Sequence, residues 1–349
     1  MSGAAARGDA ILDQRGVKRN FDAFVVAAAF DRTGARACYA LGDGTARLVD
    51  MAGKETWREV AVHDGAILAL AADTLPGGFV TGGDDGKFRR IGADGTVSTI
   101  LDAGSRWVEH VASFPAERGK GLLACAVGKL VHLFDEAGNR LKSWEHPSSV
   151  TGLVFDPKGK RVAASHYNGA TLWFVAARTD SPRKLEWKGS HIGIAMSPDG
   201  DVVMTAMQEN ALHGWRLSDN QHMRMSGYPG KTRSLSFTKG GKWLATSGAD
   251  SIVIWPFTGG GPMGKAPTEL AGGDDIAVTV ALAHPTQVAI AGGFADGLVV
   301  LADINSGRIL PVAAAGRGPV SALAWSPDGL HLAFGTETGF AGLVDFTKR

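Results

Sequence analysis

Short apolar runs separated by turn residues repeat along most of the chain. In the segment 318–346, three such runs are separated by the turns Ser326-Pro327-Asp328-Gly329 and Thr336-Glu337-Thr338-Gly339. In the first turn, proline fixes the backbone torsion of the second position and glycine suits the fourth, which predicts a type I turn. The pattern therefore predicts three antiparallel strands joined by tight turns.

The same cassette recurs eight times along the sequence. The first turn of each copy begins, at spacings of 41 to 46 residues, at Asp31, Asp73, Phe114, Asp156, Ser197, Thr238, His284 and Ser326. Most copies add a Gly/Asp turn after the second run, as at Asn168-Gly169, and a more polar fourth run, as at 140–144. No long window has the 3.6-residue period of an amphipathic helix. We expect an all-β chain with four strands in each repeat and almost no helix.

A repeat of this length with four strands is typical of a β-propeller blade. One sheet that is apolar on both faces cannot stay folded alone, but sheets packed around an axis bury one another's faces. Eight turns predict eight blades, and seven is the alternative if Thr258–Asp275 contains an irregular unit. The last cassette lacks a fourth run, and a spare one precedes the first. We therefore expect Ala10–Gln14 to pair with Phe340–Phe346 and close the ring.

The repeats resemble those of the WD-repeat β-propeller family from about residue 10 to residue 347. The Ser-Pro-Asp-Gly turns, the Asp/Asn-Gly turns and strand ends such as Phe134-Asp135 carry the resemblance. No copy has the full Gly-His and Trp-Asp signature, since Trp173, Trp215 and Trp255 are followed by Phe, Arg and Pro. The resemblance implies one propeller domain over 10–347 after disordered residues 1–9. It also implies a non-catalytic scaffold that presents loops to protein or peptide partners.

In that family, a hydrogen-bonded brace holds each blade together. It consists of a His before the first strand, a Ser or Thr on the second, an Asp in the next turn and a Trp on the third. The matching residues are His63, Thr81 and Asp85 in the second repeat, and His146, Ser165, Asn168 and Trp173 in the fourth. The resemblance implies that these part-buried polar groups satisfy one another.

Charge and cysteine content limit the classes of partner and the cellular compartment that we expect for the protein. Lys plus Arg (36) nearly balances Asp plus Glu (35), which predicts neither nucleic acid nor an acidic membrane surface as a partner. The N-terminus lacks the apolar segment of a signal peptide, and the run Phe24–Phe30 is too short to cross a bilayer. Cys38 and Cys125 lie in apolar runs of different repeats and are expected to be buried free thiols. We expect a cytoplasmic monomer without a cofactor.

Aromatic and arginine side chains in the loops between repeats are the candidate partner contacts, because such side chains anchor protein interfaces. They lie in loops that lead into the first strand of a blade, or near turns between its second and third strands. These connections open on one face of a propeller. The candidates are Arg106, Trp107, Tyr228, Arg233, Phe294 and Arg317. Local packing is the alternative for each of them, and Trp107 equally suits the core of the third blade.

A small-ligand, metal or catalytic site at the channel mouth is the alternative function. The ten histidines include no metal-binding pair at a recognisable spacing, and no nucleophile motif is present, so we do not expect an enzyme. A propeller nevertheless brings distant repeats together at its axis. This alternative predicts that Glu109, His110, His191 and Asp275 converge across blades. His110 and His191, on innermost strands, are then the first metal candidates.

Overall fold

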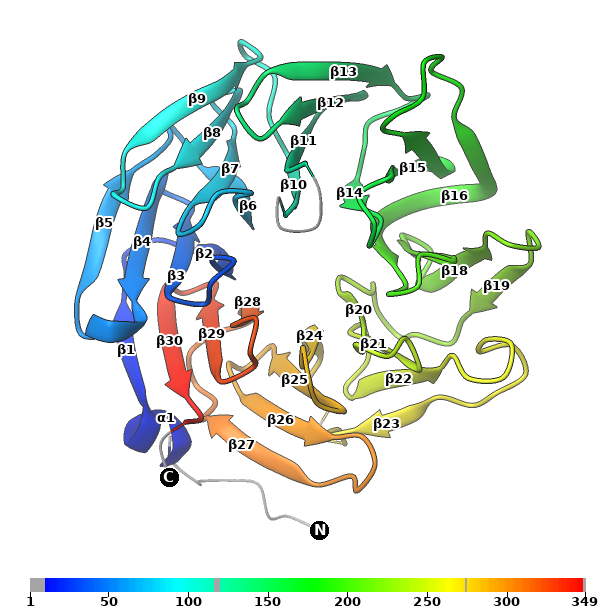
Figure 1. Cartoon of the computed structure of the whole chain (residues 1–349). Coiled ribbons are helices and arrows are strands. Elements are labelled where there is room, and N and C mark those ends of the chain that lie inside the picture. Colours follow the sequence, from blue (N-terminus) through cyan, green and yellow to red (C-terminus); the bar gives the residue numbers. More distant parts are fainter. Residues whose placement is uncertain (1–9, 116–119, 274, 348–349) are drawn as a thin grey trace.

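The computed structural model describes residues 10–115, 120–273 and 275–347, which form a ring of twisted sheets around a central axis (Figure 1). Residues 1–9, expected to be disordered, lie outside the described residues. Within the described part, helical structure is confined to α1 (Ala10–Arg15) and the short 3₁₀ helix η1 (Met51–Gly53). The prediction of an all-β propeller is confirmed.

Six of the seven hydrogen-bonded sheets in the described residues contain four antiparallel strands each. The first three are formed by β2 (Val25–Phe30), β3 (Arg36–Leu41), β4 (Thr45–Asp50) and β5 (Trp57–Ala61); by β6 (Ile67–Ala72), β7 (Phe79–Gly83), β8 (Lys87–Ile91) and β9 (Val97–Asp102); and by β10 (His110–Phe114), β11 (Leu122–Val127), β12 (Leu130–Asp135) and β13 (Arg140–Glu145). The last three are formed by β20 (Leu235–Phe237), β21 (Trp243–Thr246), β22 (Ile252–Pro256) and β23 (Thr268–Leu270); by β24 (Val278–Ala283), β25 (Ala289–Phe294), β26 (Val299–Asp303) and β27 (Ile309–Ala313); and by β28 (Val320–Trp325), β29 (His331–Thr336), β30 (Phe340–Asp345) and β1 (Gly16–Asn20).

The remaining sheet has six strands and contains two of the eight cassettes. Two of its strands, β15 and β16, each have two arms. The first arm of β15 pairs with β14 and the second with β16, whose own second arm pairs with β17. The strands are β14 (Gly152–Phe155), β15 (Arg161–Phe174), β16 (Arg183–Met196), β17 (Val202–Met207), β18 (Ala211–Arg216) and β19 (His222–Met225).

Counted by hydrogen-bonded sheets, the propeller has seven blades, the alternative number, and the expectation of eight separate blades is corrected. The reason is not an irregular unit in Thr258–Asp275, which contains β23 of a four-stranded sheet. Instead, Gly189, with φ of 115°, lets β16 continue from the fourth cassette into the fifth without a loop. All eight cassettes are present. Their inner strands contact one another in succession around the axis: β2, β6, β10, β14, the second arm of β16, β20, β24 and β28.

A strand from the N-terminal region closes the ring, as expected, but it is not the expected segment. β1 pairs antiparallel with β30, with Gly16 opposite Val344 and Asn20 opposite Phe340. Ala10–Gln14 lies instead in α1, whose Leu12 is buried against the last sheet. Alanine, leucine and glutamine favour a helix, and α1 packs there through buried Leu12 and partly buried Ile11. The closing strand is therefore polar and follows the helix.

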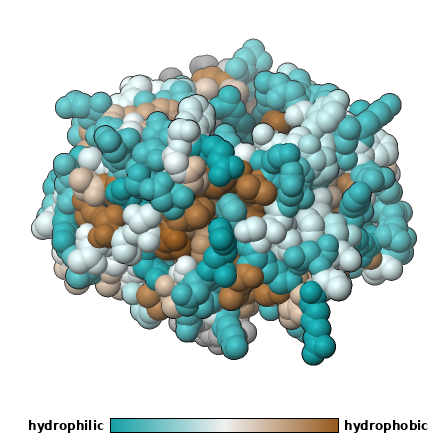
Figure 2. Space-filling view, turned by 90° about the horizontal axis from the view of Figure 1, so that it is seen from above, coloured by the Kyte–Doolittle hydropathy of each residue, from teal (hydrophilic) through white to brown (hydrophobic). Residues whose placement is uncertain are grey.

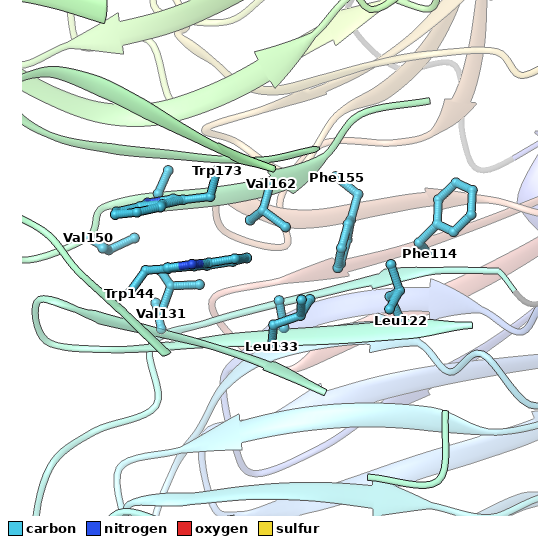
Figure 3. Close-up of a cluster of buried hydrophobic side chains, with 12 residues drawn as sticks. Phe114, Leu122, Val131, Leu133, Trp144, Val150, Phe155, Val162 and Trp173 are labelled. Carbon is cyan, nitrogen blue, oxygen red and sulfur yellow. The ribbon is translucent and has the colours of Figure 1, made fainter. Parts of the chain in front are cut away.

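The core lies between neighbouring sheets rather than at the axis. Figure 3 shows one such layer, in which Trp144 of β13 stacks on Trp173 of β15 with ring centroids 5.3 Å apart and planes 9° apart. Phe114, Phe155 and Val162 continue the same buried cluster. Since each layer ties one sheet to the next, the loops are held on a rigid frame.

Alternation of strand direction gives the ring two distinct faces. Turns between second and third strands, and loops into the next cassette, lie on one face, which we call the entry face; 103–109 and 226–234 are such loops. Connections between first and second strands and between third and fourth strands lie on the opposite face, which we call the corner face. The predicted turns at 156–159, 197–200 and 326–329 lie there and are closed by bonds from the glycine N–H to the first carbonyl.

Candidate partner-binding face

Trp107 projects from a well-anchored loop of the entry face. The N–H of the next residue, Val108, donates to the Gly83 carbonyl at 3.0 Å, and the Val108 side chain is fully buried. Because neighbouring side chains in extended backbone point in opposite directions, burial of Val108 turns Trp107 outward. Trp107 is 56% exposed and Arg106 is also exposed, so the structure excludes the alternative that Trp107 belongs to the core.

Arg233 is exposed on another loop of the entry face. Its backbone N–H and that of Ser234 both donate to Ser247 Oγ at 3.1 Å, which fixes the loop against the turn after β21. Thr232, next to it, is buried. The loop therefore presents the guanidinium group of Arg233 to solvent in a defined place.

The other three candidates are not freely exposed. Tyr228 is 8% exposed, and its hydroxyl receives a hydrogen bond from Trp255 Nε1 at 2.6 Å and lies 2.7 Å from Thr246 Oγ1. Phe294 is buried in the layer between two sheets. The guanidinium carbon of Arg317 lies 4.3 Å from the ring centroid of Phe340, a cation–π contact within the last blade. The sequence indicated the loops of Tyr228 and Arg317, but it recorded neither the burial of Tyr228 and Phe294 nor the contact between Arg317 and Phe340.

Two exposed aromatic residues of this face were missed. Tyr167 is 57% exposed at the turn between the two arms of β15, and Phe24 is 39% exposed just before β2. The signal for Tyr167 was present, since it directly precedes the Asn168-Gly169 turn, in which both residues have positive φ. A side chain at the tip of such a hairpin has few neighbours to cover it.

The brace of the second cassette has the arrangement implied by the resemblance. His63 Nδ1 donates to Asp85 Oδ1 at 2.8 Å, and Nε2 accepts from the Thr81 hydroxyl at 2.9 Å. Burial lowers the pKa of His63, which keeps the imidazole neutral. Burial opposes ionisation of Asp85, but the bonds from His63 and from the Lys87 and Asp64 amides lower the pKa of this carboxyl.

The brace of the fourth cassette is only partly brought together. His146 Nε2 accepts from Trp173 Nε1 at 3.0 Å, and Nδ1 donates to the Lys129 carbonyl at 3.2 Å. Ser165 instead faces Thr151 Oγ1 at 3.2 Å, and Asn168 Oδ1 accepts from the Gly189 amide at 3.2 Å. These two residues are satisfied elsewhere because β15 and β16 run on through this region.

The candidate metal residues do not converge. His191 is fully buried, with Nδ1 2.7 Å from Thr205 Oγ1 and Nε2 donating to the Trp187 carbonyl at 3.0 Å, so it occupies the brace position of the fifth cassette. Burial lowers the pKa of His110, the first residue of β10, to about 4. Asp275 lies in the loop before β24, with φ of 54°. Within the described ranges, no three or more His, Cys, Asp or Glu side chains are grouped so that they could hold a metal.

Comparison with known proteins gives partial sequence matches and a full-length fold match. No family model matches the chain. It is 26% identical to the WD repeat-containing protein slp1 of Schizosaccharomyces pombe over 117 residues, 32% of this chain and 24% of that protein. It is 19% identical to the pre-mRNA-processing factor 19 homolog 2 of Arabidopsis thaliana over 119 residues, 32% of this chain and 22% of that protein. The chain thus spans less than a quarter of the length of either relative.

Among solved structures, the computationally designed Ika8 protein superposes with a TM-score of 0.74 at 17% identity, covering 94% of this chain and 98% of that one. This likeness shows the fold alone. Separately, none of the helices in the described segments has the length and apolar character needed to cross a membrane. The chain is therefore a β-propeller that is similar, over 32% of its length, to a WD repeat-containing protein.

Proposed function

We propose that the protein is a non-catalytic scaffold that binds a protein or peptide partner through the entry face. The observation that carries this proposal is the exposed pair Arg106 and Trp107 on a loop fixed by buried Val108. A large aromatic side chain held in solvent by a rigid loop loses little conformational freedom on binding, which favours an interface anchor. The match to a WD repeat-containing protein supports the same class of function.

We also propose the domain extent, location and oligomeric state of this scaffold. We propose one domain over residues 10–347 that acts as a cytoplasmic monomer and needs no cofactor, nucleic acid or membrane. Near-balance of basic and acidic residues supports the absence of nucleic acid and of an acidic membrane surface as obligatory partners. The engagement of His63, His146 and His191 in blade braces supports a structural rather than a catalytic role for these histidines.

The test is quantitative affinity capture with the doubly substituted Arg106→Ala, Trp107→Ala protein. Both side chains are exposed, so the variant should fold normally, and partners of the entry face should fall at least about tenfold in recovery. Leu330→Ala, an exposed apolar residue of the corner face, is the matched control and should leave recovery unchanged. Equal partner lists for the double variant and the unmodified protein would refute the entry face as the binding surface.

A further inference from the structure

An exposed phenylalanine occupies a position that holds an aspartate in other cassettes. Phe174 is the last residue of β15, the third-strand end of its cassette, and is 43% exposed. The third strands of four other cassettes end at Asp50, Asp135, Asp303 and Asp345. Each of those carboxylates accepts hydrogen bonds from its own cassette, as Asp303 does from Ser306. Phe174 cannot do so, and its ring is left facing solvent.

Phe174 borders an apolar hollow of about 480 Å³ on the corner face, lined by Gly159, Lys160 and residues 174–177. The hollow is held in shape by the backbone, since the Val175 amide donates to the Lys160 carbonyl at 3.0 Å. Lys142 Nζ donates to the Ala177 carbonyl at 2.5 Å and so fixes the other end of the loop. A ligand would therefore meet a surface that needs little ordering.

Basic side chains without partners surround this hollow. Lys160 lines it, while Lys158 and Arg178 are exposed on the two segments that form its walls. None of the three makes a side-chain hydrogen bond or ion pair within the part of the chain that the structure describes. The surface thus combines three available positive charges with one exposed aromatic ring.

Carboxylates near these segments are already engaged. Asp156 is bound by Arg161 Nε at 2.9 Å, and Asp180 is bound by Lys142 Nζ at 2.9 Å and by Trp144 Nε1 at 3.0 Å. Asp199 of the next cassette, on which Lys158 acts electrostatically, accepts from Ser197 Oγ at 2.5 Å. The lysines and Arg178 are thus left to pair with an external anion.

We propose that this surface, formed by Lys158, Lys160, Phe174–Ala177 and Arg178, binds an acidic peptide segment of a partner protein. One apolar side chain of the segment lies in the hollow against Phe174, and carboxylates beside it pair with the basic rim. Charge complementarity selects the acidic segment, and the aliphatic lining from Val175, Ala176 and Ala177 suits an apolar peptide side chain. This surface lies on the face opposite Trp107, so it is separate from the proposed entry-face function.

The experiment selects ligands from a display library of random short peptides on the immobilised full chain, and measures the selected peptides by fluorescence anisotropy. The expected ligands are rich in Asp and Glu around an apolar residue. Phe174→Asp, which installs the residue of four other cassettes, should weaken them at least about tenfold without unfolding the blade. The double variant Lys160→Glu, Arg178→Glu should also bind the selected peptides at least about tenfold more weakly. Its affinity should fall less than that of the unmodified protein when the salt concentration rises from about 50 mM to about 300 mM.

Matched controls on the same face separate this effect from general surface changes. Leu330→Asp alters an apolar residue of similar exposure, and Lys239→Glu alters an exposed lysine of another cassette; both should bind like the unmodified protein. Selection of basic or uncharged peptides, selection of none, or equal affinity for Phe174→Asp would overturn the proposal. The proposal would also be overturned if the protein self-associated and Phe174→Asp abolished the self-association, because the surface would then bind a second copy of the chain. Binding of phosphatidylserine vesicles with no peptide selected would overturn it as well, because the surface would then bind a membrane.

Discussion

At the scale of single residues, one position near the start of four of the eight cassettes shows how a buried polar group is satisfied. His63, His146 and Tyr228 precede the first strand of a cassette, and His191 begins the arm of β16 that serves as the first strand of the fifth cassette. All four side chains reach toward the second or third strand. Tyr228 bridges Thr246 and Trp255 where the second, fourth and fifth cassettes use imidazole. A phenol and an imidazole can both link a hydroxyl to an indole N–H, so the position accepts either residue.

His146→Ala should destabilise the fold by roughly 1–3 kcal/mol, because Trp173 Nε1 would lose its acceptor inside a buried layer. Urea unfolding followed by tryptophan fluorescence measures the change in free energy of unfolding. Tyr167→Ala, an exposed neighbour, should change it by less than about 0.5 kcal/mol. Equal effects of the two substitutions would show that the His146–Trp173 bond does not stabilise the blade.

Tyr228→Phe distinguishes a structural tyrosine from an interface tyrosine. The ring is kept and the hydroxyl removed, so Trp255 Nε1 loses its acceptor, and the free energy of unfolding should fall by roughly 1–3 kcal/mol. Partner recovery at temperatures where the variant is folded should not change. Unaltered stability combined with lost partner binding would show instead that Tyr228 contacts the partner.

At the scale of elements, the closing segment couples a short helix to a polar strand. The β1 strand supplies backbone hydrogen bonds to β30, while Leu12 of α1 supplies the apolar contact, 1% exposed beside Phe340 and Val344. On the other side of the same blade, Lys54, next to η1, donates to the buried carboxylate of Asp345. Burial opposes ionisation of Asp345, but the bonds from Lys54 and Thr347 lower its pKa well below the usual range.

Leu12→Ala should destabilise the protein by about 2–5 kcal/mol, because it removes the main buried side chain of α1 and leaves a cavity. Hydrogen exchange should show the amides of β1 and β30 exchanging faster, with those of β11 and β12 unchanged. Gln14→Ala, an exposed position of the same helix, is the control. Uniform acceleration over all blades would mean that the ring opens as a whole rather than at its seam.

At the scale of the whole molecule, buried histidines make stability depend on pH. Burial lowers the pKa of His110 and of His146 from about 6.5 to about 4, and burial together with neighbouring His222 lowers that of His213 to about 3. At a pH between the ordinary histidine pKa of about 6.5 and the lowered pKa in the fold, the unfolded chain binds protons that the folded chain does not. Stability is therefore complete above about pH 6.5 and is lost as the pH falls toward 4.

The urea midpoint should accordingly fall between pH 7 and about pH 4.5, a range in which carboxylates with lowered pKa values such as Asp345 stay ionised in the folded state. His146→Phe, which cannot be protonated, should show a smaller fall than the unmodified protein. The comparison uses the change with pH, so a constant loss of stability in the variant does not affect it. A midpoint that stays level over this range would contradict the assignment of these imidazoles as neutral in the fold.

The sequence by itself determined the repeat, the strands and their turns. Proline and glycine at 326–329 restrict their own backbone torsions, and apolar residues along a strand indicate which of its faces are buried. Turns and strands can therefore be predicted from neighbouring residues alone. The resemblance to WD repeats implied that His63, Thr81 and Asp85 form one brace, and the order of strands and loops placed exposed Trp107 and Arg233 in loops of one face. The unusual third-strand end at Phe174 was also visible as a departure from aspartate.

Only the tertiary structure decided which side chains are buried and which strands pair, because both depend on residues far away in the sequence. Tyr228 and Phe294 are buried by Trp255 and by a neighbouring sheet, which no local pattern records. Continuity of β16 through Gly189, and the choice of β1 over Ala10–Gln14 as the closing strand, depend on which backbone groups find partners across the ring. Burial and pairing are properties of the closed assembly, because each sheet face is covered only by the next blade, and they therefore emerge only when the ring is complete.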